Sequence, residues 1–351
     1  MADQAGRRIL ITGIASPLAA RLAARLEADD RVEHLVGIDL REPARKLERT
    51  EYVRADLRNP LVAKILDSSR ADTVVHLSIT AAPHRAGGRA RMKELNVIGT
   101  MQLLAAAQKS TRLRKLVLKS TTAVYGSNYA DPALFREEVA PGGAPRSGYS
   151  KDAVEVEGYG RAFGRRRSDV TLSVLRFANF IGPDVDSPLT RYLALPVVPM
   201  VLGYDPRLQL VHSDDAVEIL YRSTMEEHPG IYNVAGPGIV YLSQAVRLAG
   251  KPSIPVPHPF VNGLAGMVRR SGVVDFSPEQ LQFLMFGRVG SIDRMRAEFG
   301  YTPAYSTKEA LLDFLRSGRV TPLIDRERVE RAERDLGELI KRAGRMLAPQ
   351  R

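Results

Sequence analysis

The segment that most constrains this chain is residues 8–26. It reads as a buried strand, a tight turn opening with Thr12 and Gly13, and a helix carrying Leu18, Leu22 and Leu26 at a spacing of four. The free N–H groups and the dipole of a helix N-terminus favour an anion at such a turn. The segment therefore predicts a phosphate site, and an α/β fold in which the rest of the chain completes a dinucleotide-binding sheet.

Composition sets the class of protein. With 351 residues, 44% of them hydrophobic, the chain can bury one large core with a smaller lobe attached. It has no cysteine, which excludes disulfides and thiolate metal sites, and we predict no metal centre. No apolar run is long enough to span a membrane, and the N-terminal residues lack the apolar centre of a signal peptide. A cytoplasmic protein without a transmembrane segment is expected.

The net charge of +11 comes mostly from arginine. Such a balance suits anionic small molecules, nucleic acid or an anionic membrane surface, and it also follows simply from a GC-rich genome. Because the chain carries no recognisable nucleic-acid motif, we expect an anionic small molecule and no nucleic-acid partner.

The opening turn resembles the TGxxGxxG fingerprint of the extended short-chain dehydrogenase/reductases, a family that includes UDP-glucose 4-epimerase and sugar-nucleotide dehydratases. Ser16 and Ala19 replace the second and third glycines. Ser16 narrows the approach to a pyrophosphate, and Pro17 has no N–H to offer it. The resemblance implies a Rossmann-type doubly wound, mainly parallel sheet, a small C-terminal substrate lobe and NAD as cofactor.

The remaining cofactor residues follow from the strand ends and from that resemblance. Asp39 ends the second predicted strand, where a carboxylate accepts both ribose hydroxyls of NAD and repels the 2′-phosphate of NADP, although Arg41 and Arg45 blur this choice. A plain strand-end turn is the alternative for Asp39. Residues 55–60 resemble the family's adenine-contacting segment, and 94–107 resemble its NVxGTxxLLEAA helix. The predicted cofactor residues are Gly13, Ser16, Pro17, Leu18, Asp39, Asp56, Leu57, Ser78, Asn96, Ser120 and Lys151.

The predicted catalytic residues depart from the family pattern. Residues 120–126 resemble the SSxxVYG signature, which places the catalytic hydroxyl on Thr121. In the family's YxxxK motif, read over 147–151, Ser147 stands at the tyrosine position and Lys151 is retained. Tyr149 comes two residues later, about 200° around a helix from Ser147, and is expected to face away. We therefore predict Thr121, Lys151 and Ser147 as the catalytic set.

The substrate side follows from residues 176–183, which resemble the family's RxxNxYGP turn and place Asn179 near a bound sugar nucleotide. Arg191 and Tyr192 lie in the Pro-interrupted segment beyond it. Residues 209–216 resemble the segment that organises the lobe, so His212 and the aspartates after it are expected to be structural. The predicted division is 1–182, with returning segments near 205–236, for the NAD-binding domain, 183–318 mainly for the substrate lobe, and 319–351 for a C-terminal amphipathic helix.

The apolar seam of 326–347 should dock on the same chain or on a second copy, and a homodimer is expected. By resemblance the chain is an NAD-dependent epimerase/dehydratase-type oxidoreductase acting on a nucleotide sugar or a similar anionic molecule. The alternative is a catalytically impaired NAD-binding or scaffold protein of the same fold, since Ser147 cannot replace a phenol and weak turnover would follow.

Overall fold

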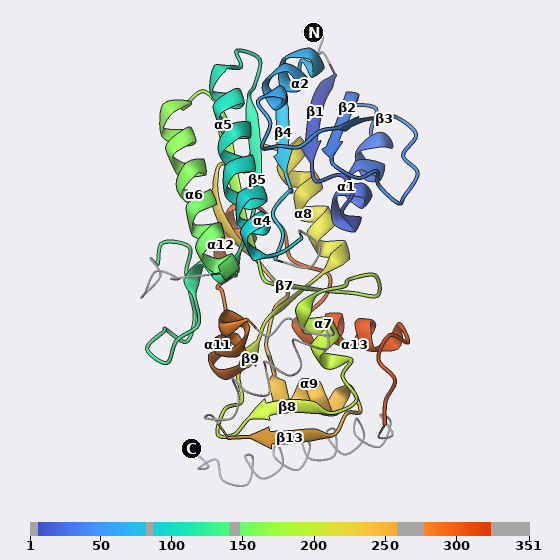
Figure 1. Cartoon of the computed structure of the whole chain (residues 1–351), viewed down its shortest axis with the longest axis vertical. Helices are drawn as coiled ribbons and strands as arrows, with labels where there is room; N and C mark the ends of the chain where they lie inside the picture. Colours follow the sequence, from blue (N-terminus) through green and yellow to red (C-terminus); the bar gives the residue numbers. More distant parts are fainter. Residues whose placement is uncertain (1–5, 82–86, 140–147, 258–276, 324–351) are drawn as a thin grey trace, which may run out of the picture.

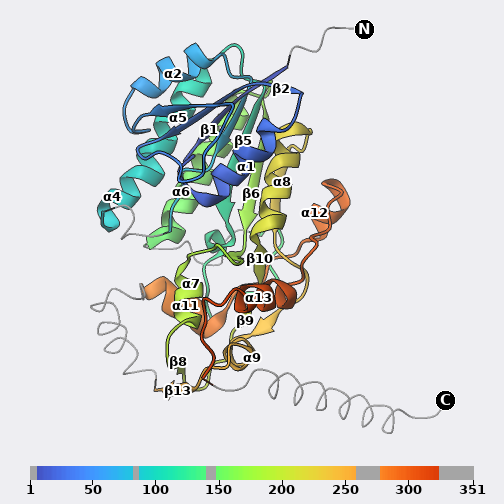
Figure 2. The same cartoon turned by 90° about the vertical axis from the view of Figure 1, so that its right-hand side faces the viewer.

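The computed structural model describes residues 6–81, 87–139, 148–257 and 277–323 (Figure 1). Ser147 and residues 324–351 of the predicted C-terminal helix lie outside these residues, and 319–323 form no helix. In the described part the chain forms a sheet flanked by helices, with a smaller group of elements below it (Figures 1 and 2).

The seven-stranded sheet has the order β11-β6-β5-β4-β1-β2-β3, and each neighbouring pair is parallel. This confirms the doubly wound, Rossmann-type sheet expected from the first strand, turn and helix. The order reverses beside β1, so the carboxyl ends of β1 and β4 open a crevice there. The strands are β1 (Arg7–Thr12), β2 (Val32–Asp39), β3 (Thr50–Arg54), β4 (Thr73–His76), β5 (Lys115–Thr121), β6 (Thr171–Phe177) and β11 (Gly230–Val234).

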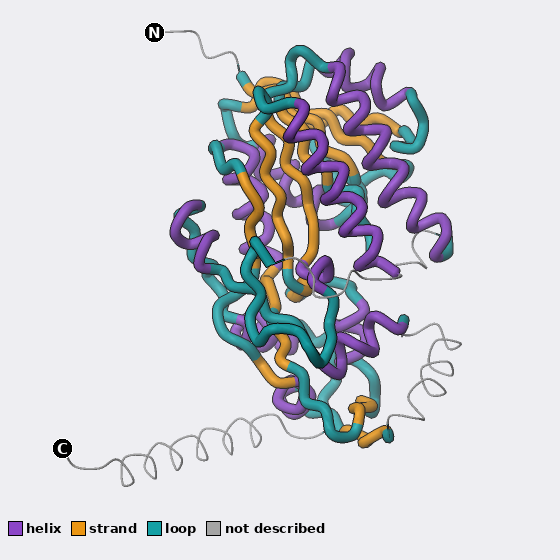
Figure 3. The backbone as a smooth tube through the Cα atoms, turned by 90° about the vertical axis from the view of Figure 1, so that its left-hand side faces the viewer, coloured by secondary structure: helices purple, strands orange, loops and turns teal. Residues whose placement is uncertain are grey.

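Helices cover both faces of the sheet (Figure 3). Helices α1 (Pro17–Glu27), α8 (Ser213–Met225) and α12 (Asp293–Glu298) bury their apolar residues against one face. Helices α2 (Leu61–Ser69), α5 (Gly99–Lys109) and α6 (Gly148–Arg166) cover the other. The predicted helix over 94–107 starts earlier, because α4 (Arg89–Lys93) and a π-helical turn, η1 (Glu94–Ile98), lead into α5.

A second core lies below the sheet and joins residues from Ile181 to Val320. The proline-containing residues 251–257 include a strand, β13 (Ser253–Val256), that pairs in parallel with β8 (Val198–Val201). The pairing is short and stands at an edge, where proline is tolerated. The remaining elements are η2 (Thr122–Tyr125), β7 (Asn179–Ile181), α7 (Pro188–Leu193), β8 (Val198–Val201), β9 (Arg207–Leu208), β10 (Leu210–His212), β12 (Val240–Tyr241), α9 (Leu242–Leu248), β13 (Ser253–Val256), α11 (Pro278–Phe286) and α13 (Thr307–Arg316).

The turn between β1 and α1 requires its glycine. Gly13 has a φ of +76°, and a Cβ there would stand 3.0 Å from the backbone of Ser78 on the neighbouring strand end. Ser16 caps α1 by accepting a hydrogen bond from Ala19 N, and Pro17 fills the first helical position. The turn therefore approaches β4 closely and leaves the N-terminus of α1 facing the crevice.

Candidate functional site

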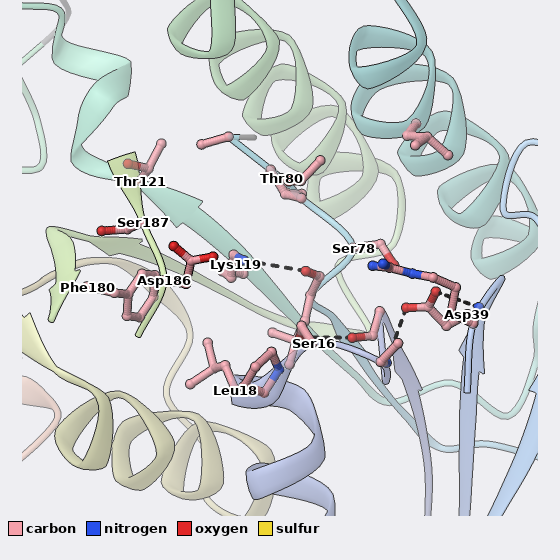
Figure 4. Close-up of a pocket in the computed structure, with 18 of the residues that line it drawn as sticks. Ser16, Leu18, Asp39, Ser78, Thr80, Lys119, Thr121, Phe180, Asp186 and Ser187 are labelled. Atoms are coloured by element: carbon pink, nitrogen blue, oxygen red, sulfur yellow. Dashed lines mark hydrogen bonds between the residues drawn. The ribbon is translucent and has the colours of Figure 1, made fainter. Parts of the chain in front are cut away.

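The crevice forms a cavity of about 910 Å³ at the carboxyl ends of the central strands, here called the main cavity (Figure 4). It runs from Asp39 on β2, past the turn before α1, to Thr121 at the end of β5. Most of the predicted cofactor residues meet in its wall, namely Gly13, Ser16, Pro17, Leu18, Asp39, Asp56, Leu57, Ser78 and Ser120.

Two carboxylates lie at the β2–β3 end of the main cavity. Asp39 accepts hydrogen bonds from Ala15 N at 3.2 Å and Arg41 N at 3.1 Å, so it stands directly beside the phosphate-type turn. Asp56 pairs with Arg58 at 2.6 Å, and that guanidinium holds the pKa of the Asp56 carboxyl below its usual range. The Asp39 carboxylate can therefore accept hydrogen bonds from hydroxyl groups of a ligand whose anionic part lies at the turn before α1.

We expect Asp39→Asn to reduce the preference for NAD over NADP, because the variant loses a charged acceptor for the ribose hydroxyls and the repulsion of a 2′-phosphate. The ratio of the two dissociation constants should change on the order of tenfold or more. Titration calorimetry with each dinucleotide measures it, with Asp67→Asn on the exposed face of α2 as control. An unchanged ratio would leave Asp39 as a turn residue.

The opposite end of the main cavity holds two hydroxyls in contact. The side chain of Tyr149, at the start of α6, hydrogen bonds with that of Thr121 on β5. Burial raises the pKa of the Tyr149 phenol, while the hydrogen bond from Thr121 and the positive charge of Arg288 act in the opposite direction. In this pair the Tyr149 phenol can act as an acid/base group, and the Thr121 hydroxyl can bind an oxygen atom of a ligand.

The placement of Tyr149 corrects the sequence prediction, which had this side chain facing away. The face of α6 that packs on the sheet carries Ala153, Val156, Gly160 and Phe163, and Tyr149 begins that row. Lys151 lies on the opposite side of the helix, 45% exposed and 4.0 Å from Glu155. It does not appear among the described residues that line the cavity. The apolar spacing, and not the match to YxxxK, determines which side chain points inward.

Two contacts fix that register of α6. Glu157 forms a buried, two-point pair with Arg176 on β6, at 2.7 and 2.9 Å, and also accepts from Ser120 Oγ at 2.5 Å. Glu279 on α11 accepts hydrogen bonds from the N–H groups of Tyr149 and Ser150, at 3.0 and 3.3 Å. The N-terminus of α6 is therefore held from both the sheet and the lobe.

Gly148 makes the second of these contacts sterically feasible. Its φ is +73°, and a Cβ at this position would overlap the Glu279 carboxylate. Sequence analysis missed both Gly148 and Glu279, because they act through a contact between segments 130 residues apart.

A smaller cavity of about 140 Å³, here called the side cavity, adjoins the main one. Both cavities are lined by Thr121, Tyr149 and Asn179, so the hydroxyl pair stands where they meet. Arg288 also lines the side cavity; burial lowers its pKa to about 10, and its Nε has no hydrogen-bond partner among the described residues. An unpaired buried donor beside a cavity is suited to an oxygen atom of a ligand.

Several predicted residues have other roles in the structure. Asn96 is buried and bonds both the N–H and the carbonyl of Thr80, so it supports the loop after β4 without appearing among the described residues of the cavity wall. Arg191 pairs with Asp186 at 2.6 Å and lines neither of these cavities, whereas the neighbouring Tyr192 lines the side cavity. Asn179 is thus the predicted substrate residue that reaches both cavities.

The His and Asp residues of 209–216 are structural. His212 caps α8 and stacks on Tyr305, while Asp215 accepts hydrogen bonds from Tyr301 Oη and Ala304 N. Within the described ranges, no group of three or more His, Cys, Asp or Glu side chains is placed to hold a metal ion. The helices of that part of the chain also include none long and apolar enough to cross a membrane.

A family model and a sequence relative each match more than half of this chain. The sequence model of the NAD-dependent epimerase/dehydratase family matches residues 9–235, more than half of the chain. An uncharacterized protein of Mycobacterium tuberculosis is 43% identical over 325 residues, covering 92% of this chain and 86% of that protein.

Two solved structures show the same fold at lower identity. UDP-glucose 4-epimerase from Thermotoga maritima, solved with UDP-glucose, aligns with a TM-score of 0.68 at 19% identity, over 89% of this chain and 98% of its own. The dTDP-glucose 4,6-dehydratase from Bacillus anthracis, solved with NAD, gives 0.66 at 19% identity, over 89% and 96%.

Proposed function

Since this chain belongs to the NAD-dependent epimerase/dehydratase family, we propose that it is an NAD-linked oxidoreductase acting on a nucleotide sugar, with Tyr149 as its acid/base residue. The observation that carries the proposal is the Tyr149–Thr121 pair at the junction of the two cavities. The main cavity offers a dinucleotide site on one side of this pair, and the side cavity offers a compact pocket on the other.

The residues of the main cavity fit a dinucleotide. Gly13 allows the turn to pack closely on Ser78, the N-terminus of α1 faces the cavity, and the Asp39 carboxylate accepts a hydrogen bond from Ala15 N in the same turn. We assign Gly13 and the first turn of α1 to the pyrophosphate and Asp39 to the adenosine ribose. The NAD preference rests on Asp39, and its test is the dinucleotide titration described above.

Tyr149 would accept the proton of the reacting alcohol, and Thr121 would bind its oxygen. The nicotinamide, when bound, supplies the acceptor and later the donor of a hydride. Thr121 Oγ1 holds the substrate oxygen, and Tyr149 Oη takes the hydroxyl proton as that oxygen becomes a carbonyl; both steps reverse when the sugar is reduced. Positive charge near the phenol, here from Arg288, favours its ionised form and so helps it accept the proton.

The side cavity would take the sugar. Its walls include apolar side chains of Met92, Leu189 and Phe283, and its polar groups include Asn179 and the unpaired Nε of Arg288. This combination of an apolar wall and few directed donors is typical of pockets that orient a small polar ring. The solved relatives bind UDP-glucose or act on dTDP-glucose by name, so these are the first substrates to test.

We expect the NAD-loaded protein to convert UDP-glucose, UDP-galactose or dTDP-glucose, with product followed by NMR and the reduced nicotinamide by absorbance. Binding of NAD without conversion or nicotinamide reduction by any of these sugars would favour the scaffold alternative. Absence of binding heat and of a thermal shift with both NAD and NADP would remove the cofactor assignment altogether.

A further inference from the structure

A lysine lies in the main cavity that the mechanism above does not use. Lys119 stands two residues before Thr121 on β5, so both side chains emerge from the same face of the sheet. Lys119 lines the main cavity, and Figure 4 shows it between Asp39 at one end and Thr121 at the other. Lys119 therefore lines the stretch of the main cavity that lies between Asp39 and Thr121.

Lys119 has few partners for a charged group in such a position. Its Nζ donates to Leu77 O at 3.5 Å, a long hydrogen bond, and lies 5.9 Å from the centre of the Phe180 ring. Among the described residues, none of the ion pairs includes Lys119. Burial lowers its pKa to about 8. An ammonium kept in this position without a carboxylate leaves two N–H groups for a ligand.

Helix α6 brings no positive charge to the main cavity one helical turn beyond Tyr149. Lys151 points away from the cavity, and the residue four positions after Tyr149 is Ala153, which packs with Val124, Tyr125 and Phe135. No side chain one helical turn beyond Tyr149 therefore brings a positive charge to the cofactor. Lys119 reaches the same cavity from the sheet instead.

We propose that the ammonium of Lys119 is the cofactor-side cation of this site, in place of Lys151, and that it favours the neutral reduced nicotinamide over the cationic oxidised one. The inference rests on the proposed function, because Thr121 and Tyr149 define the reactive end of the dinucleotide. A positive charge a few ångströms from the ring repels the oxidised form alone, whereas its attraction to the pyrophosphate is common to both forms. The ratio of the two affinities therefore isolates the effect on the ring.

Lys119 shares the main cavity with other charged or titratable side chains. Those that line it are Arg21, Asp39, Arg41, Arg54, Asp56, Arg91, Tyr149, Asp184 and Asp186, and His76 on β4 is affected by the charge of Lys119. Burial lowers the pKa of His76 to about 3, so it stays neutral, and burial raises that of the Tyr149 phenol. Below a pKa of about 8 Lys119 is charged, and above it the charge is lost.

Titration calorimetry with NAD⁺ and with NADH tests the inference at about pH 6.5 and about pH 9.5, on either side of the lysine pKa. In the native protein NADH should be favoured more strongly at the lower pH, by on the order of tenfold in the ratio of dissociation constants. Lys119→Met should lose this preference at both values, and Lys119→Arg should keep it at both. Lys151→Met, on the exposed side of α6, is the matched control and should behave like the native protein.

The outcomes separate the two claims. A ratio in Lys119→Met equal to the native ratio at both pH values would overturn the role of Lys119 while leaving the cofactor site intact. A loss of the preference in Lys151→Met would return the cation to α6. Failure of the native protein to bind either dinucleotide would instead overturn the proposed function, and this inference with it.

Discussion

Replacing Tyr149 by Phe is expected to lower the turnover of a nucleotide-sugar substrate by about 10² to 10⁴-fold, the usual contribution of a positioned acid/base group. The phenylalanine keeps the ring against the apolar cluster that includes Ile79, Leu118 and Val156 but removes the oxygen that bonds Thr121. Because the change is confined to the reaction end of the main cavity, the affinity for NAD should stay nearly constant. Steady-state assays and calorimetry on the same preparation measure both quantities.

Tyr159→Phe is the matched control for this variant. Tyr159 lies on the same helix, and 38% of it is exposed. Its replacement should leave turnover and stability unchanged, because Tyr159 is not among the described residues that line either cavity. Equal turnover of Tyr149→Phe and the native protein would show that the proton goes elsewhere, and Tyr149 would then be a packing residue.

Glu157→Ala is expected to lower the free energy of unfolding by about 3 to 5 kcal/mol, the cost of leaving one partner of a buried ion pair alone. Glu157 accepts two hydrogen bonds from Arg176 and one from Ser120, and 1% of it is exposed. The variant leaves the Arg176 guanidinium buried beside Tyr125 without its carboxylate. Denaturant titration of the native protein and the variant gives the difference.

Glu155→Ala separates this effect from a general effect of removing a glutamate from α6. Glu155 lies 4.0 Å from Lys151 and 3.9 Å from Lys93 on the outer side of the helix, where such pairs contribute little. We expect a change of at most about 0.5 kcal/mol. If Glu157→Ala destabilises no more than Glu155→Ala, the pair does not hold α6 in its register.

The sheet and the nucleotide end of the main cavity could be predicted from the sequence because each depends on local patterns. Apolar runs separated by helical periodicity predicted the parallel strands, and residues 8–26 predicted a strand, a tight turn and a helix N-terminus suited to a phosphate. Asp39 was found because it ends a strand, and the carboxyl ends of parallel strands share one edge of the sheet.

The reaction end could not be predicted in the same way. The alignment of Ser147 and Lys151 with the family's YxxxK motif predicted one register for α6, yet the apolar residues at 153, 156, 160 and 163 face the sheet in another. That spacing is present in the sequence and would have placed Tyr149 inward. Burial of an apolar face outweighs the position of a lysine that remains solvated on the outside.

No pattern in the sequence predicts the roles of Glu279 and Arg288. Glu279 acts on α6 from a segment 130 residues away, and Arg288 reaches the carbonyl of Gly126 from a distance of 162 residues. Such contacts depend on how the lobe docks on the sheet, which neither periodicity nor turn chemistry specifies. The same holds for Lys119, whose surroundings depend on which side chains the fold brings to the main cavity.

The most direct test of the account is the turnover of the double variant Ser147→Tyr/Tyr149→Phe beside its two single variants. The account places the acid/base phenol at position 149, so Ser147→Tyr alone should leave turnover near the native value. The double variant should then be as slow as Tyr149→Phe. Recovery of turnover in the double variant, or a large gain in Ser147→Tyr alone, would contradict the account by showing that the residue at position 147 faces the reaction centre.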